Sequence, residues 1–283
     1  MQMITSSDQM AALTRELRRA GKRIGFVPTM GALHEGHLSL VRTARARSDA
    51  VVVSIFVNPT QFGPSEDFSQ YPRNLDQDAK MLSAEKTDFI FHPAVEEIYP
   101  QAAATWVTVE GLSEKLEGRS RPGHFRGVTT VVSKLFHIAQ PDIAFFGQKD
   151  AAQLAIIRKM VRDLKFDVEI VACPIVREKD GLAMSSRNAY LDSEQRRQAL
   201  VLYRALMRIQ LLVDRGEIRS SELTTAGKQV LAEEPAVRLD YLEMVDPDTL
   251  EPLPSLAKPA LVAVAAYLGN TRLIDNIVIS PRF

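Results

Sequence analysis

The first residues whose side chains could take part in a reaction are two histidines in a short loop that also contains glycines. His34 and His37 stand three residues apart in His-Glu-Gly-His, with Gly31 and Gly36 beside them. At that spacing on the first turn of a helix, two imidazoles lie on the same side, where backbone N–H groups and the helix dipole attract an anion. The pattern predicts a site that donates hydrogen bonds to a departing polyphosphate, and a loop with two solvated histidines is the alternative.

Two known motifs come close to this loop, and each fails. Gly31 and Gly36 have the spacing of a phosphate-binding P-loop, but His37 and Leu38 replace its Lys-Ser/Thr pair. The two histidines are three positions apart, whereas the zinc-protease motif separates its histidines by four. The loop therefore predicts neither of these two sites.

A second group of candidates follows an apolar segment in Phe146-Gly-Gln-Lys-Asp150. Asp150 can accept hydrogen bonds from the hydroxyls of a ribose, and Lys149 can meet a phosphate as a point charge. An ordinary helix N-cap explains Asp150 equally well. By itself this motif leaves both interpretations open.

A third group, Met184-Ser-Ser-Arg187, lies in a polar loop that follows the strand-rich part of the chain. Two hydroxyls and a guanidinium on a mobile loop can close over a triphosphate, because serine donates hydrogen bonds and arginine binds phosphate bidentately. An exposed turn is an alternative of equal weight.

Further polar residues could complete a small-molecule site. Gln61 and Gln153 can orient a hydroxy acid without titrating. A basic loop that contains Arg121 and His124 could clamp an acidic substrate or lie in water. The acidic residues Asp76, Asp78 and Glu85 could meet a metal ion, and the alternative is a solvated helix face.

Alternating strands and helices must position these groups. Apolar segments predict strands at residues 23–27, 50–57, 88–91, 143–146 and 168–171, and amphipathic segments predict helices at residues 38–48, 75–85, 128–139 and 151–164. This alternation is typical of an α/β fold with a Rossmann-like, doubly wound parallel sheet that binds ligands at the carboxyl ends of its strands.

The pattern changes after residue 176. Helices are predicted at residues 194–215 and 221–232, and strands at residues 238–245, 260–267 and 272–279. We therefore expect two domains, a Rossmann-like domain of residues 1–177 and a smaller C-terminal α+β lid domain of residues 178–283.

Balanced charge and a single cysteine exclude several classes of protein. The 283 residues include 35 Lys+Arg and 35 Asp+Glu, so no net charge draws the chain to nucleic acid or to an anionic membrane. Cys173 alone forms no intramolecular disulfide. The longest apolar stretch, residues 260–268, is about half the length of a membrane span. The N-terminus lacks the regions of a secretory signal, so a cytoplasmic location is predicted.

Five motifs are specific in combination. They are Pro28-Thr-Met-Gly-Ala-Leu-His-Glu-Gly-His37, Phe56-Val-Asn-Pro-Thr-Gln-Phe62, Arg121-Pro-Gly-His-Phe-Arg-Gly127, Phe146-Gly-Gln-Lys-Asp150 and Met184-Ser-Ser-Arg-Asn188, with Leu273-Ile-Asp-Asn276 near the end. Together they resemble the pantothenate synthetase (pantoate–β-alanine ligase) family of the HxGH nucleotidyltransferase-like group. Its members join pantoate to β-alanine while ATP is cleaved to AMP and pyrophosphate. The resemblance implies pantoate and β-alanine as small-molecule partners, ATP with Mg²⁺, and a homodimer.

The resemblance also implies roles for individual residues. The expected catalytic residues are His37 as proton donor, His34, Lys149, Ser185, Ser186 and Arg187. The expected ATP-binding residues are Met30, Gly31, Ala32, Leu33, His34, Glu35, Gly36, His37, Gly147, Gln148, Lys149, Asp150, Val176, Met184, Ser185, Ser186 and Arg187. The expected substrate-binding residues are Gln61 and Gln153 for pantoate, with Gln61 also near β-alanine, and Asn58 and Arg121. Some members carry an amide near the metal where this chain has Met81, so Mg²⁺ is expected mainly on phosphate oxygens and water.

The implied chemistry agrees with the residue types. A carboxylate is a poor acceptor for an amine, so adenylation first converts it into a mixed anhydride whose leaving group is AMP. Negative charge then builds on pyrophosphate, which needs hydrogen-bond donors already in place. Two alternatives remain, an adenylyl- or cytidylyltransferase of the same HxGH group and a non-catalytic nucleotide-binding regulator.

Overall fold

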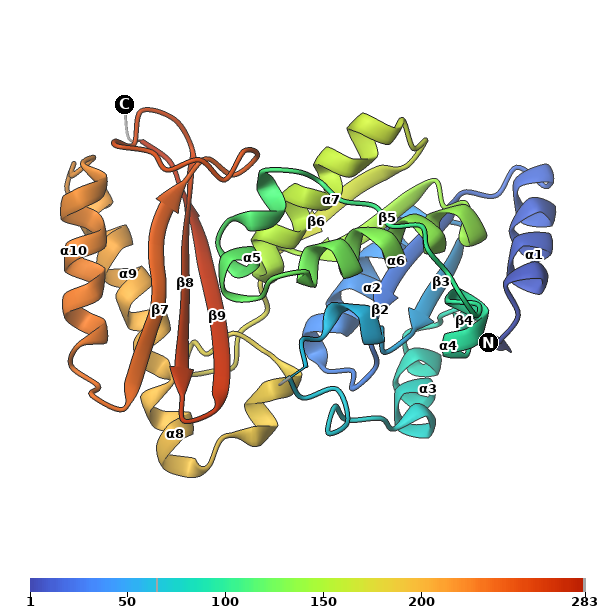
Figure 1. The fold of residues 1–283 in the computed structure, drawn as a ribbon, viewed down its shortest axis with the longest axis horizontal. Helices are drawn as coiled ribbons and strands as arrows, with labels where there is room; N and C mark the ends of the chain where they lie inside the picture. Colours follow the sequence, from blue (N-terminus) through green and yellow to red (C-terminus); the bar gives the residue numbers. More distant parts are fainter. Residues whose placement is uncertain (65, 282–283) are drawn as a thin grey trace.

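A parallel sheet of six strands forms the centre of the larger part of the molecule (Figure 1). The computed structural model describes residues 1–64 and 66–281. The strands are β1 (Gln2–Ile4), β2 (Ile24–Thr29), β3 (Ala50–Ile55), β4 (Phe89–Phe91), β5 (Ile143–Gly147) and β6 (Glu169–Cys173). They lie in the order β1–β4–β3–β2–β5–β6, so the chain winds outward in both directions from the β2–β5 pair. This arrangement confirms the predicted Rossmann-like, doubly wound sheet.

Helices cover both faces of this sheet. They are α1 (Ser7–Arg19), α2 (Glu35–Arg47), α3 (Leu75–Ala84), α6 (His124–Ala139) and α7 (Ala151–Leu164). Phe26 and Val52 belong to a core cluster with α1, α6 and α7, whereas Val27 and Val53 belong to a cluster with α2 and α3. Successive side chains of a strand point to opposite faces, so these continuously apolar strands are buried from both sides.

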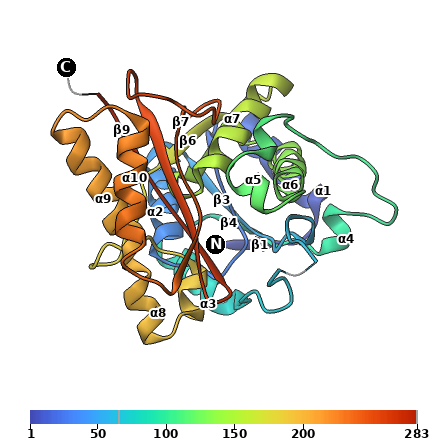
Figure 2. The ribbon, with the colours of Figure 1, turned by 60° about the vertical axis from the view of Figure 1, so that its left-hand side comes forward.

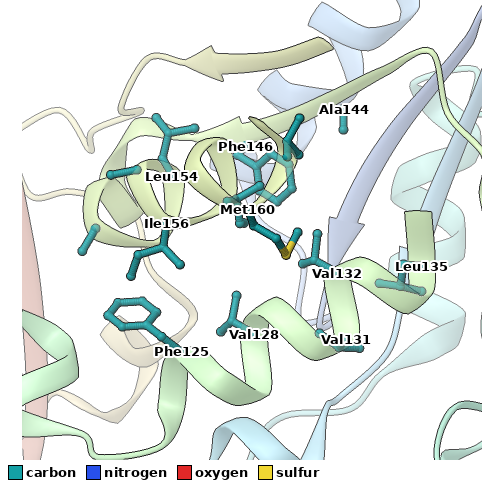
Figure 3. Close-up of a cluster of buried hydrophobic side chains, with 14 of the residues drawn as sticks. Phe125, Val128, Val131, Val132, Leu135, Ala144, Phe146, Leu154, Ile156 and Met160 are labelled. Atoms are coloured by element: carbon teal, nitrogen blue, oxygen red, sulfur yellow. The ribbon is translucent and has the colours of Figure 1, made fainter. Parts of the chain in front are cut away.

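The core between α6 and α7 fixes one wall of the site. Phe125, Val128 and Val132 on α6 cluster with Phe146 on β5 and Met160 on α7 (Figure 3). Since Phe146 is the penultimate residue of β5, this packing determines where the loop after that strand begins.

A separate three-stranded antiparallel sheet forms the smaller C-terminal part, with two long helices on its outer face (Figures 1 and 2). Its elements are α8 (Ser193–Gln198), α9 (Leu200–Asp214), α10 (Ser220–Leu231), β7 (Val237–Val245), β8 (Ala260–Leu268) and β9 (Thr271–Ile279). Val262 and Val264 pack with α9 and α10, whereas Tyr241, Ala263 and Ala265 join the core of the parallel sheet. The predicted α+β character of this part is confirmed.

Some predicted boundaries were wrong. β2 continues through Pro28 and Thr29, because both remain in register with β3 and the Thr29 hydroxyl donates to the carbonyl oxygen of Ser54 at 2.8 Å. The helix predicted at residues 194–215 is divided into α8 and α9 at Ala199. There the N–H of Leu202 donates to the carbonyl oxygen of Ala199, three residues earlier, which tightens the turn. Strand β1 was not predicted, because three residues are too short for a recognisable pattern.

Short helical segments complete the described chain. They are η1 (Pro59–Gln61), α4 (Val95–Ile98), η2 (Leu112–Glu114), α5 (Glu117–Ser120), η3 (Gln148–Asp150) and η4 (Ser186–Tyr190). The segments η1, η3 and η4 overlap or adjoin the predicted site motifs. They turn the chain immediately next to the predicted site residues.

Candidate active site

A cleft of about 230 Å³ lies at the carboxyl ends of the central strands. Met30 and His34 reach it from the loop after β2, and Asn58, Gly147 and Val176 reach it from the ends of β3, β5 and β6. The cleft lies where the strand order changes direction between β2 and β5, which is where doubly wound sheets bind ligands.

The two histidine rings stand side by side in this cleft, with their centroids 4.1 Å apart. Nδ1 of His34 accepts a hydrogen bond from the N–H of Gly36 at 3.1 Å, so His34 is the N-cap of α2 and not a residue of its first turn. This cap starts α2 at Glu35, three residues earlier than predicted. Nδ1 of His37 accepts from the backbone N–H of His34 at 3.4 Å. A neutral imidazole whose Nδ1 accepts carries its proton on Nε2, so each ring can donate to a ligand through Nε2–H.

Both histidines are neutral at pH 7. Burial lowers the pKa of His37 to about 3, and the neighbouring His34 and Lys149 contribute to the shift. Burial also lowers the pKa of His34 to about 4, assisted by Lys149 and opposed by Asp150. The histidine pair can therefore donate hydrogen bonds to a ligand but carries no fixed positive charge at pH 7.

A buried carboxylate holds the backbone that precedes the histidines. Gly31 and Ala32 both have positive φ angles, +77° and +50°. Asp78 of α3 is 3% exposed and accepts hydrogen bonds from the N–H groups of Ala32 and Leu33 at 3.0 and 2.9 Å. Asp78 therefore positions the histidine loop. The alternative of a solvated helix face was wrong for this residue, because its carboxylate points inward to meet two backbone donors.

Asn58 orients the predicted substrate ligand Gln61. Asn58 is 1% exposed, and its Nδ2 donates to Oε1 of Gln61 at 3.0 Å and to the carbonyl oxygen of Gly127 at 3.1 Å. Its Oδ1 accepts from the N–H and the hydroxyl of Thr60. Nε2 of Gln61 lies 3.1 Å from the sulfur of Met30. Gln61 thus keeps its amide N–H groups on the side of the cleft, where Met30 is a weak acceptor that a substrate hydroxyl can replace.

Arg121 is engaged by its neighbours. Its Nε and a terminal nitrogen donate to the two carboxylate oxygens of Glu66 at 2.7 and 2.6 Å. A second terminal nitrogen lies 3.0 Å from Nε2 of His124, whose Nδ1 lies 2.7 Å from the carbonyl oxygen of Gln61. Because a guanidinium only donates, the His124 proton is on Nδ1 and is directed to Gln61. Burial, with a contribution from Arg121, lowers the pKa of His124 to about 4.

The loop after β5 brings Lys149 and Asp150 to the cleft. Asp150 occupies the N-cap position of α7, as the alternative predicted, but its side chain makes no capping hydrogen bond. Asn276 on β9 donates to the carbonyl oxygens of Gln148 and Lys149 at 3.0 and 2.9 Å. The smaller sheet therefore contacts this loop directly.

The Ser185–Arg187 segment also lines the cleft. Oγ of Ser185 accepts from the N–H of Arg187 at 3.3 Å, and Oγ of Ser186 lies 3.5 Å from the hydroxyl of Tyr71. The Arg187 guanidinium is paired with both carboxylate oxygens of Asp67 at 3.0 and 3.2 Å. A phosphate ligand that bound Arg187 through these two nitrogens would replace this carboxylate.

Most of the predicted site residues line the cleft. These are Met30, His34, Gly36, His37, Asn58, Gln61, Arg121, Gly147, Lys149, Asp150, Gln153, Val176, Met184, Ser185, Ser186 and Arg187. Five predicted ATP-binding residues, namely Gly31, Ala32, Leu33, Glu35 and Gln148, are not part of the lining. Glu35 pairs instead with Arg42, and the amide of Gln148 donates to Oδ1 of Asn276 at 3.3 Å.

Several residues that position the site were given no such role from the sequence. Glu66 and Asp67 hold the two arginines, and Asn276 holds the loop after β5. Each pair joins residues 55 to 128 positions apart, so no local spacing indicates it. The balance of 35 cationic and 35 acidic residues shows only that carboxylates are numerous, so it could not identify these partners.

Residues 1–64 and 66–281 contain neither a group of side chains that could hold a metal ion nor a helix that could cross a membrane. No three His, Cys, Asp or Glu side chains are arranged there to hold a metal ion. Of the acidic residues considered above, Asp76 is exposed and Glu85 pairs with Arg42 at 2.7 Å. No helix of these ranges is both long enough and apolar enough to span a bilayer.

Comparison with known proteins assigns the family. The pantoate-beta-alanine ligase family matches residues 2–278. The chain belongs to this family. Pantothenate synthetase of Koribacter versatilis is 65% identical over 279 residues, which are 99% of this chain and 96% of that protein. Pantothenate synthetase of Thermotoga neapolitana is 54% identical over 99% of this chain and 100% of its own.

Solved structures of the same family share the fold. Pantothenate synthetase from Thermus thermophilus matches with a TM-score of 0.95 and 48% identity, over 99% of this chain and 100% of the other. The pantoate-beta-alanine ligase of Francisella tularensis, complexed with beta-gamma ATP and β-alanine, matches with a TM-score of 0.82 and 34% identity over 98% and 97%. The activity of the chain is the family's activity, the ligation of pantoate to β-alanine to form pantothenate.

Proposed function

We propose that this cleft carries out both steps of the ligation, and the pair of neutral histidines is the observation that carries the assignment. In the first step a carboxylate oxygen of pantoate attacks the α-phosphorus of ATP, and pyrophosphate leaves with the electron pair of the broken P–O bond. His34 and His37 can donate through Nε2–H to the phosphate oxygens. Donors fixed before the reaction stabilise the developing charge without reorganising.

The other motifs supply the remaining contacts to ATP. Lys149, Ser185 and Ser186 bind the phosphates, and Arg187 leaves Asp67 to pair with the triphosphate. Asp150, whose carboxylate does not cap α7, accepts the ribose hydroxyls. The backbone at Val176 meets the adenine. The five predicted ATP-binding residues that do not line the cleft shape its loops from behind, namely Gly31, Ala32, Leu33, Glu35 and Gln148.

Pantoate lies next to the histidines, with its hydroxyls on Gln61 and Gln153. Val128 and Val131 of α6 line the same cleft and suit the methyl groups of this acid. Asn58 and Arg121 act through Gln61, which they hold by its side chain and its backbone. Both substrates of the first step are therefore bound by the segments at the carboxyl ends of the strands.

In the second step the amine of β-alanine attacks the carbonyl carbon of the pantoyl adenylate. The C–O bond to AMP breaks, AMP leaves with the electron pair, and the nitrogen gives up a proton to form the amide. The acyl adenylate reacts readily with water, so it must be shielded during this step. We assign the shielding to residues 178–283 as a lid, and the binding of nucleotide and pantoate to residues 1–177.

Mg²⁺ enters with ATP as part of the substrate. Asp78 already accepts hydrogen bonds from two backbone N–H groups, and Asp150, which lies beside Lys149, is assigned to the ribose. Phosphate oxygens and water are therefore the ligands that best suit the ion.

Two further expectations are a homodimer, which the resemblance implies, and a cytoplasmic location. Sedimentation velocity tests the first, and a stable monomer at micromolar concentration would reject it. Fluorescence microscopy of the tagged full chain in bacterial cells tests the second, and a signal confined to the cell envelope would contradict it.

The decisive assay mixes the purified protein with ATP, Mg²⁺ and pantoate, with and without β-alanine. We expect pyrophosphate to form with pantoate alone, and AMP and pantothenate to appear once β-alanine is added. Release of a dinucleotide-like product would favour a nucleotidyltransferase, and ATP binding without turnover would favour a regulator.

Gln153→Ala tests the assignment of the pantoate site. We expect pantoate affinity to fall about tenfold, since one hydrogen bond to the acid is lost, with ATP affinity unchanged. Gln101→Ala is the matched control, because Gln101 is exposed. Isothermal titration calorimetry measures both constants. Unchanged pantoate affinity with weakened ATP binding would show that the assignment is wrong.

A further inference from the structure

Asn276 is a buried residue of the smaller sheet whose whole amide is used by the loop after β5. It is 2% exposed. Its Nδ2 donates to the carbonyl oxygens of Gln148 and Lys149 at 3.0 and 2.9 Å, and its Oδ1 accepts from Nε2 of Gln148 at 3.3 Å. Both of its N–H groups and its oxygen therefore face the segment that carries Lys149.

The preceding residue, Asp275, holds a different segment. Asp275 is 4% exposed, and its carboxylate pairs bidentately with Arg177 at 2.6 and 2.9 Å. Arg177 also donates to the carbonyl oxygen of Gly181 at 3.0 Å, and its guanidinium lies 4.5 Å from the ring centre of Tyr203. Asp275 thus anchors the beginning of the connection that leads to Ser185.

The two contacts attach two segments of the cleft to neighbouring residues of one strand. Successive side chains on a strand point to opposite sides, so neighbouring residues of β9 can reach two different segments at once. One segment is Gly147–Asp150 and the other is the connection from residue 176 to residue 188. Both line the same cleft. The view in Figure 1 shows β9 as the strand of the smaller sheet that faces the parallel-sheet domain.

We propose that Asp275 and Asn276 are positioning residues for adenylation, which set Lys149 and Arg187 at the spacing that the triphosphate requires. This inference rests on the proposed binding of ATP by those two segments. The smaller sheet then does more than cover the intermediate, because it determines the geometry of the phosphate-binding groups. A displacement of about 1 Å in such groups is enough to slow a reaction about a hundredfold.

Asn276→Ala tests this directly. We expect single-turnover pyrophosphate release from ATP and pantoate to slow about 10- to 100-fold, while pantoate affinity stays within about twofold of wild type. The matched control is Asn270→Ala, which changes an exposed asparagine in the turn between β8 and β9. The control is expected to react at the wild-type rate.

A double-mutant cycle with Lys149→Ala separates positioning from general loss of stability. If Asn276 acts through Lys149, its replacement has a much smaller effect once Lys149 is absent, so the two effects on the adenylation rate are not additive. Additive effects would overturn the proposal, and so would an Asn276→Ala protein that unfolds at a lower temperature but adenylates pantoate at the wild-type rate.

Asp275→Asn tests the second link with an almost isosteric change. It removes the charge that pairs with Arg177, and we expect the KM for ATP to rise about five- to tenfold with pantoate affinity unchanged. An unchanged KM for ATP would overturn the role of Asp275. The proposed function and this inference fail differently, because wild-type protein that releases no pyrophosphate rejects the former, whereas active wild type with unaffected variants rejects only the latter.

Discussion

The histidine loop and the arginines that line the same cleft are held in place by different kinds of interaction. His34 and His37 are fixed through Nδ1 by backbone N–H groups, and burial keeps both rings neutral. Arg121 and Arg187 are charged and are fixed by carboxylates, Glu66 for the first and Asp67 for the second. The neutral donors need no counterion, whereas each cation has one already.

This difference indicates when each group acts. A neutral N–H donor with its other nitrogen occupied is ready before any ligand arrives and changes little on binding. A guanidinium in an ion pair must exchange one anion for another, so it gains only the difference between the two pairings. We therefore expect the histidines to contribute mainly to the rate of adenylation, and Arg187 mainly to the binding of the triphosphate.

The largest effect is expected for His37→Ala. If the ring is a prearranged donor to the departing pyrophosphate, its loss slows adenylation about 10²- to 10³-fold while the protein stays folded. Rapid-quench measurement of single-turnover pyrophosphate release gives this rate. His137→Ala, at an exposed histidine of α6, is the control. A variant that adenylates pantoate at the wild-type rate would remove the role given to His37.

A smaller effect is expected when the support of the loop is removed. Asp78→Ala leaves the N–H groups of Ala32 and Leu33 without their acceptor, so the free energy of unfolding should fall by about 2–3 kcal/mol. Asp76→Ala changes an exposed aspartate of the same helix and should alter it by less than about 0.5 kcal/mol. Urea unfolding measures both values. Equal stability of the two variants would contradict the positioning role of Asp78.

Substitutions of Arg187 and of its partner Asp67 are expected to change the affinity for ATP in opposite directions. Arg187→Ala should raise the Kd for ATP about tenfold, because a charge-assisted contact is lost. Asp67→Asn should lower it about two- to fivefold, since the guanidinium no longer has to leave a carboxylate. Calorimetric titration with a non-hydrolysable ATP analogue measures both constants. A shift in the same direction for both variants would show that Asp67 supports the bound state instead.

The last expected effect concerns pH and the half-buried His124. Its pKa is about 4 in the folded protein, below the value of about 6.5 for an unfolded histidine, so the unfolded chain binds more protons between these values. The stability that His124 contributes in its neutral form is fully present above about pH 6.5 and is lost as the pH falls toward 4. At pH 5 this loss should lower the free energy of unfolding by about 1–2 kcal/mol. The His124→Asn variant should lack this decrease. Unfolding free energies at pH 7.5 and pH 5 test this, and an unchanged pH dependence in the variant would contradict it.

Prediction from sequence was accurate where the signal is local. The alternation of apolar strands with amphipathic helices indicated the doubly wound sheet, and α7 was predicted with the same bounds that it has in the structure, Ala151–Leu164. Motifs that directly follow strands were placed at one edge, because the carboxyl ends of parallel strands meet there. The start of α2 was wrong because histidine is an uncommon N-cap, so its capping role had no sequence signal.

The sequence by itself determined the class of fold, and it located the histidine loop and the two motifs that we assign to phosphate binding, since these depend on side-chain periodicity and on short spacings. Only the tertiary structure decided which carboxylate or amide side chain meets which backbone group or cation. Asp78 reaches Ala32 across 46 positions and Asn276 reaches Lys149 across 127, which no local pattern encodes. The protonation of the histidines was also decided there, because burial and neighbouring charge, set by the packing of distant segments, control their pKa values.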